Sequence, residues 1–190
     1  NSADTAVFQS RQWRHRMRGH KKLLNDYPPD GAERSLFDFV MGEQGGLPRI
    51  VGFMNDWARA LPTLRRHLVV RYEDLRTETA RELDRVLRFL GTPGDGKAVQ
   101  DAVDYASFER MRARESAGTA IAGAGERLTA ADPGNPDSFK TRRAKVGGYR
   151  DDLDAEQAAA VDAYVAEHLD PVFGYGPDAA RATPQPAGAE

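Results

Sequence analysis

The chain has 190 residues, 40% of them hydrophobic and 29% charged, which is the composition of a globular domain rather than of an unfolded chain. The absence of cysteine excludes disulfides, thiolate metal sites and a cysteine nucleophile. The formal charge of −2 gives no overall attraction to nucleic acid or membrane, and no apolar run approaches the roughly 20 residues that cross a bilayer. We therefore expect a cytoplasmic protein with no nucleic-acid or membrane partner. An excess of Arg over Lys, with much Ala, is typical of a GC-rich bacterial genome.

The first third of the chain predicts helices. Apolar side chains at helical spacing favour a helix over 4–18, which the Pro- and Gly-containing run at 27–31 ends. A short apolar element at 36–40 follows. A clearer amphipathic helix occupies 47–61, with a proline just beyond it.

The middle of the chain offers one strand. Leu68-Val69-Val70 predicts a short buried strand, and Thr79–Glu82 has the pattern of a capping box that opens a helix ending before Gly91. Shorter helices are expected at 98–103 and 107–113. One strand cannot form a sheet, because its backbone groups need neighbours. We therefore expect either a mostly helical fold or partner strands that precede Asn1.

The last third combines a long loop, a helix and a tail. Residues 114–137 are rich in Gly, Ala, Asp and Pro and predict a mobile loop, of the length that functional lids have. The run 154–157 opens a last helix, which Pro171 ends. From Pro177 onward the composition predicts a disordered tail.

The densest group of candidate ligand-binding residues lies near 140–150. Four cations fall within six residues, directly before a glycine pair that lets backbone approach a ligand closely: Lys140, Arg142, Arg143 and Lys145. Arginine presents a planar fork of donors that suits phosphate. A solvated basic loop is the alternative interpretation of the same residues.

Other candidates have equally ordinary alternatives. The run 71–75 follows the expected strand, where open α/β sheets bind ligands, or it is a plain strand–helix turn. Phe108 beside Ser107, at an expected helix start, offers a ring for a base and amides for an anion, or is a core residue. The basic stretch 11–22 is a polyanion contact or a solvated helix face. The four histidines lack metal-ligand spacing, so no metal site is predicted.

Taken together and in order, these segments resemble the PAPS-dependent sulfotransferases. Residues 1–8 look like the family's R-[DN]-P-x-D-x-x-V-S element without its arginine. Residues 71–75 with Phe89-Leu90-Gly91 match R-Y-E-D-L before F-L-G, and 106–111 are similar to T-S-F-x-x-M. Residues 142–151, followed by Glu156-Gln157, are similar to R-K-G-x-x-G-D-W-[KR]-N ahead of an E-Q helix.

The resemblance implies an α/β, P-loop NTPase-like three-layer fold to which this chain contributes mostly helices and few strands. Residues 1–176 would be the C-terminal part of one sulfotransferase domain and 177–190 a disordered tail. The donor PAPS would leave as PAP. The implied roles are the 3′-phosphate contact for Arg142, Arg143 and the backbone at Ala144, the adenine edge for Tyr72, stacking for Phe108, and neighbouring contacts for Ala106, Ser107 and Met111.

The chain also departs from the family pattern. Phe8 stands where the family has a phosphate-binding serine, and Ala144, Gly148 and Tyr149 replace Gly, Asp and Trp. The phosphate-loop lysine, the catalytic histidine and the arginine of the first element would all precede Asn1. No catalytic residue is therefore expected in this chain, which would be inactive alone.

The function implied is transfer of a sulfuryl group from PAPS to a hydroxyl or amine of a small-molecule acceptor, without a metal. Residues 114–137 would be a lid on the acceptor side. The family's dimerisation motif is not evident. A P-loop-type kinase and a non-catalytic module that binds a polyanion through 11–22 remain as alternatives.

Overall fold

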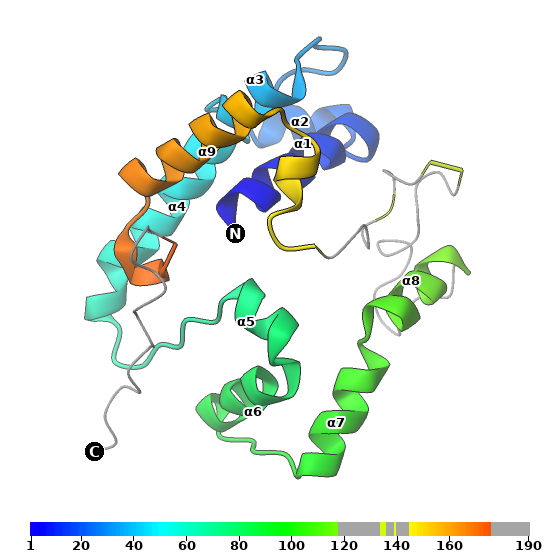
Figure 1. Cartoon of the computed structure of the whole chain (residues 1–190), viewed down its shortest axis with the longest axis vertical. Helices are drawn as coiled ribbons and strands as arrows, with labels where there is room; N and C mark the ends of the chain where they lie inside the picture. Colours follow the sequence, from blue (N-terminus) through cyan, green and yellow to red (C-terminus); the bar gives the residue numbers. More distant parts are fainter. Residues whose placement is uncertain (118–133, 136–138, 140–144, 176–190) are drawn as a thin grey trace.

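The structure is a computed structural model that describes residues 1–117, 134–135, 139 and 145–175. Within those ranges the chain is predominantly helical and contains no strand (Figure 1). The expectation of mostly helices is confirmed, whereas the predicted tail at 177–190 lies outside the described residues. None of the described helices is long and apolar enough to cross a membrane.

Most of the helices form two groups (Figure 1). A bundle lies in the upper part of the view and consists of α1 (Ser2–His15), α3 (Leu36–Met41), α4 (Leu47–Ala60) and α9 (Ala155–His168). An arc lies below it and consists of α5 (Tyr72–Thr77), α6 (Thr79–Leu90), α7 (Gly96–Tyr105) and α8 (Phe108–Ser116). Short elements complete the described chain: α2 (Gly19–Leu24) and the 3₁₀ turns η1 (Leu61–Thr63), η4 (Gly148–Asp151) and η5 (Pro171–Phe173).

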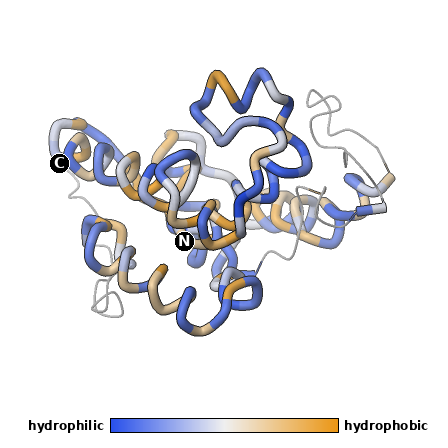
Figure 2. Tube along the Cα trace, turned by 90° about the horizontal axis from the view of Figure 1, so that it is seen from above, coloured by the Kyte–Doolittle hydropathy of each residue, from blue (hydrophilic) through white to orange (hydrophobic). Residues whose placement is uncertain are grey.

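The core belongs to the bundle. Hydrophobic and hydrophilic residues alternate along the helices, as in amphipathic elements (Figure 2). The buried side chains that meet at the centre come from α1, α3, α4, η4 and α9 and from positions just after η4 and α9: Ala3, Ala6, Val7, Val40, Leu47, Val51, Tyr149, Leu153, Ala158, Val161 and Leu169. Asn55 of α4 ties in the end of α9, because its amide donates to the carbonyl of His168 (2.7 Å) and accepts from the backbone of Asp170 (2.9 Å).

The first helix is shorter than predicted. It ends at His15, the backbone is extended at Arg18 (ψ 148°), and the separate helix α2 follows. Arg14 and Arg18 would be like charges four residues apart in a continuous helix, which is unfavourable, and Gly19 is a poor helix former. The sequence prediction of one helix over 4–18 is wrong in its last turn.

The predicted strand at 68–70 is wrong. These residues are half-buried and have no strand partner among the described residues. Instead, the carbonyl of Val69 accepts a hydrogen bond from the guanidinium of Arg85 on α6 (3.3 Å). An extended segment whose backbone carbonyl is hydrogen-bonded by a side chain, and not by another strand, is a connection between helices.

The capping box predicted at Thr79–Glu82 is absent, whereas a capping box that was not predicted is present at the start of α9. At the start of α6, the hydroxyl of Thr79 donates to the carbonyl of Leu75 (2.7 Å) instead of capping, and Glu82 is buried against Arg85. At the start of α9 the box is present: the Asp154 carboxylate accepts from the backbone of Gln157 (2.8 Å), whose side chain accepts in return (3.3 Å). The difference arises because α5 and α6 follow each other almost without a break, so that Thr79 still faces a helical carbonyl.

The loop predicted over 114–137 begins later than expected. Helix α8 continues to Ser116, and the guanidinium of Arg114 donates to the carbonyl of Tyr105 (2.9 Å), which ties α8 back to the end of α7. The prediction is therefore wrong for 114–116. Most of the remainder lies outside the described residues.

Candidate functional site

Four of the predicted adenine-binding residues share one helix start. Ser107 is the N-cap of α8, and its hydroxyl accepts from the backbone of Arg110 (3.4 Å). Ala106 precedes it, Phe108 is the first residue of α8, and Met111 lies one turn further on. Phe108 and Met111 are half-buried, so each ring or thioether is held by the protein and still presents surface. The predicted helix start is confirmed, and the roles of these residues stay predictions.

Tyr72 lies on a different element. It is the first residue of α5, and its side chain is 45% exposed. Figure 1 shows α5 at one end of the arc and α8 at the other, with α6 and α7 between them. The structure therefore places Tyr72 and the α8 start on the same arc, but not on adjacent elements.

The residues beside Tyr72 anchor α5 to the C-terminal segment. Tyr175 donates from its hydroxyl to the Glu73 carboxylate (2.7 Å), and the guanidinium of Arg71 lies 4.8 Å from the Tyr175 ring centroid. Burial and the hydrogen bond to Glu73 raise the pKa of Tyr175. Burial alone would raise the pKa of Glu73, but the hydrogen bonds that it accepts, first from Tyr175, outweigh burial and lower it. Glu73 is therefore a charged anchor, and Tyr72 is left at the surface.

The residues proposed for the phosphate, Arg142, Arg143 and Ala144, lie outside the described residues. Both flanks of this stretch are described. Phe139 on the first flank is buried, and the guanidinium of Arg112 on α8 lies 3.5 Å from its ring centroid. The second flank begins at Lys145, whose ammonium pairs with Asp151 (2.7 Å).

The second flank is fastened to α1. The Asp4 carboxylate accepts hydrogen bonds from the backbone of Gly147 (2.7 Å) and Tyr149 (2.9 Å), one on each oxygen. Gly147 has φ +72°, which a residue with a side chain rarely adopts, so glycine suits this turn. Arg11 adds an ion pair to Asp152 (2.7 Å). The basic stretch thus runs between a contact with α8 and a clamp on α1.

Tyr149 and Arg150 complete the clamp from α9. The Tyr149 ring is buried in the core and its hydroxyl donates to Asp162, while the guanidinium of Arg150 donates two hydrogen bonds to the same carboxylate (2.7 and 3.0 Å). Burial, with help from the Asp162 hydrogen bond, raises the pKa of Tyr149. Burial tends to raise the pKa of Asp162, but the bonds from Arg150 and Tyr149 outweigh it and lower that pKa. The tyrosine that replaces the family's tryptophan is therefore a structural residue here.

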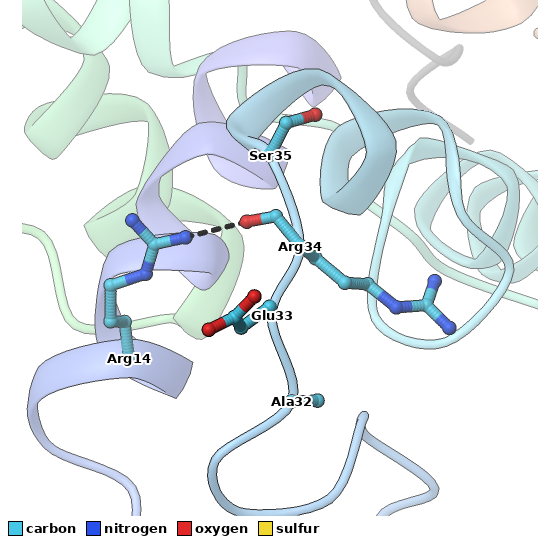
Figure 3. A pocket seen from close by; sticks show the side chains of 5 residues that line it. All are labelled: Arg14, Ala32, Glu33, Arg34 and Ser35. Carbon is cyan, nitrogen blue, oxygen red and sulfur yellow. Dashed lines mark hydrogen bonds between the residues drawn. The ribbon is translucent and has the colours of Figure 1, made fainter.

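A pocket that is open to solvent lies elsewhere, between Arg14 of α1 and the segment 32–35. It has a volume of about 380 Å³ and is lined by Arg14, Ala32, Glu33, Arg34 and Ser35 (Figure 3). Arg14 donates to the backbone carbonyl of Arg34 (2.8 Å), whereas the side chain of Arg34 points away from it. None of the predicted donor-site residues lines this pocket. Among the residues that the structure describes, there is also no cluster of acidic and histidine side chains that would hold a metal ion.

Comparison with known proteins identifies the family. The model of the sulfotransferase domain matches residues 4–173, which is most of the chain. The chain belongs to the sulfotransferase family. No curated protein and no solved structure matched it in the corresponding searches. The family assignment supports a transferase that moves sulfuryl groups. The matched residues include nearly all of α1, the arc, the segment that Asp4 holds and α9.

Proposed function

We propose that this sulfotransferase chain forms the adenine and 3′-phosphate half of a PAPS site, within a P-loop-like three-layer fold. The acceptor would be a hydroxyl or amine of a small molecule, and PAP would be the product. The observation that carries the proposal is the tethering of the basic stretch 140–145 between α8, through Phe139, and α1, through the Asp4 clamp. Phe139, on the first flank of this stretch, contacts α8, the helix whose start carries the candidate adenine residues.

The chemistry of each group suits its proposed partner. Guanidinium groups of Arg142 and Arg143 would bind the 3′-phosphate by charge-assisted, bidentate hydrogen bonds. The half-buried ring of Phe108 would stack on adenine, which is worth about 1–3 kcal/mol per base in other single-base contacts. Tyr72, exposed at the start of α5, would approach the edge of the base.

In this proposal the chain binds and orients the donor rather than reacting with it. Sulfuryl transfer needs cations on the transferring group and a base for the acceptor. The family resemblance assigns neither role to a residue in 1–190. The chain alone is therefore expected to bind PAP without catalysing transfer.

Calorimetric titration of the full gene product with PAP and with 5′-AMP tests the proposal. PAP is expected to bind at least about tenfold more tightly than AMP, because one bidentate arginine contact is worth about 1.5–3 kcal/mol. Arg142→Ala is expected to remove most of that preference, and the exposed Arg76→Ala serves as the matched control. Equal affinity for PAP and AMP, or an unchanged preference in Arg142→Ala, would refute the assignment.

A further inference from the structure

The corner formed by the end of α1 and by α2 carries two fully exposed leucines. Leu23 is 83% exposed and Leu24 is 80% exposed, at the C-terminal end of α2. Side chains this large are usually covered in a soluble protein, and adjacent exposed ones mark a contact surface. Nothing in the proposed donor site uses these residues.

The stretch that carries these leucines is basic in sequence. No acidic residue occurs between Asp4 and Asp26 in the sequence. The exposed side chains of this stretch include three cations and two histidines: Arg14, Arg18, Lys21, His15 and His20. Neither Arg18 nor Lys21 forms an ion pair with any residue that the structure describes, and Arg14 donates only to the carbonyl of Arg34. The charge of this surface is therefore available to a partner.

The leucines face outward because the opposite side of α2 is anchored. Lys22 is only 4% exposed: its ammonium pairs with Asp30 (2.6 Å) and lies 5.5 Å from the ring centroid of Trp13. Trp13 in turn donates to the carbonyl of Pro28 (2.8 Å) and stacks on Phe39 of α3 at 5.1 Å between ring centroids. With Lys22 turned into the protein, the next two residues of the helix turn away from that contact. The anchoring of Lys22 therefore holds Leu23 and Leu24 at the surface.

The combination of exposed leucines and nearby cations favours one kind of partner. A nucleic acid would engage the cations through its phosphates, but it would leave two adjacent leucines in water. The surface of an anionic bilayer satisfies both, because headgroups attract each nearby Lys or Arg by about 1 kcal/mol and the acyl boundary accepts apolar side chains. Three acidic residues lie beside the corner. Asp26 accepts a hydrogen bond from the amide of Gln44 (3.3 Å), Asp30 pairs with Lys22 (2.6 Å), and Glu33 lines the pocket that Arg14 also lines.

We propose that the corner Arg14–Leu24 docks on the surface of an anionic phospholipid bilayer, with Leu23 and Leu24 inserted at the headgroup boundary. This is a peripheral contact and does not require a spanning helix. It departs from the sequence-based expectation of no membrane partner, which rested on the charge of the whole chain. The local charge of this corner differs from that average. The proposal is independent of the donor site.

Co-sedimentation of the full gene product with phosphatidylcholine vesicles, with and without phosphatidylserine, tests the proposal. Binding is expected only with phosphatidylserine and is expected to weaken as salt is raised. The double substitution Arg18→Gln/Lys21→Gln is expected to weaken binding about 25-fold, at about fivefold for each charge. Leu23→Ser/Leu24→Ser is expected to weaken it at least about tenfold.

Matched controls place the same changes elsewhere on the surface. Leu90→Ser/Val172→Ser removes two other exposed apolar side chains (64% and 53%), and Arg65→Gln/Arg76→Gln removes two other exposed charges. Both are expected to bind vesicles like the wild type, and circular dichroism checks that every variant is folded. Absence of vesicle binding would overturn the proposal. Vesicle binding that is unchanged in Leu23→Ser/Leu24→Ser would also overturn it. So would binding of an oligonucleotide to this surface that the leucine substitutions leave unchanged.

Discussion

Asp4 joins parts of the chain that are far apart in sequence. Its two carboxylate oxygens accept from backbone groups 143 and 145 residues further on, and both contacts are partly buried. Hydrogen bonds to a charged group are stronger than neutral ones, and neither backbone donor has another acceptor among the residues that the structure describes. Asp4 is therefore a structural residue that holds the flank of the basic stretch against α1.

Replacing Asp4 by alanine is expected to lower the free energy of unfolding by about 2–4 kcal/mol, because two backbone donors lose a charged acceptor. Urea denaturation measures the change. Asp101→Ala is the control: Asp101 pairs with Lys97 on the exposed face of α7, and an exposed pair of this kind contributes about 0.3–0.5 kcal/mol. Equal effects of the two substitutions would contradict the clamp.

Asp162 makes the clamp sensitive to acid. Its pKa is lowered in the folded protein, because the bonds from Arg150 and Tyr149 outweigh burial. A carboxyl group with a lowered pKa contributes stability above its unfolded pKa, and that contribution is lost as the pH falls through the folded value. Asp162→Asn is expected to lack this contribution. The difference in unfolding midpoint between wild type and variant should be largest near neutral pH and shrink below about pH 4. A difference that stays constant with pH would show that the charge is unimportant.

The helices with clear periodicity and a proper cap were predicted well. α4 and α9 follow their apolar patterns closely, and α9 begins where the run 154–157 predicts, with a capping box formed by Asp154 and Gln157. Such local signals need no tertiary information, because the cap satisfies backbone donors within one turn.

Removal of the α9 cap by Asp154→Ala is expected to cost about 1 kcal/mol, within a usual range of about 0.5–2 kcal/mol. Thermal denaturation followed by circular dichroism measures it. Thr79→Ala at the start of α6 is a useful comparison, because Thr79 does not cap its helix. A larger loss of thermal stability in Thr79→Ala than in Asp154→Ala would contradict the assignment of these two helix starts.

The elements that were missed depend on tertiary context. The strand prediction for 68–70 used β-branched composition, but a strand needs a neighbour, and the carbonyl of Val69 is met by Arg85 instead. Helix α2 was missed because a run of cations gives no periodicity, and its position depends on Lys22 packing over Trp13. The same limit applies to the site: the sequence indicated the cluster at α8 and the basic stretch. The clamp of Asp4 on Gly147 and Tyr149 appears only in three dimensions.

The main buried core and the described candidate adenine residues lie on different groups of helices. The bundle holds the buried core, while α6 of the arc keeps Leu90 at the surface (64% exposed). Leu47→Ala in the bundle is expected to cost about 2–5 kcal/mol, because a fully buried leucine leaves a cavity, whereas Leu90→Ala is expected to change stability little. Urea denaturation of both variants measures the contrast, and comparable losses would argue against a core confined to the bundle.

Amide hydrogen exchange of the full gene product, with and without PAP, is the sharpest test of the proposed donor site. PAP is expected to protect the start of α8 (107–111), the stretch 140–149 and the start of α5. No change is expected at Arg14–Leu24. 5′-AMP should protect α8 but not 140–149, because it lacks the 3′-phosphate. Protection confined to Arg14–Leu24, or equal protection by the two nucleotides, would contradict the donor site and favour a polyanion-binding surface instead.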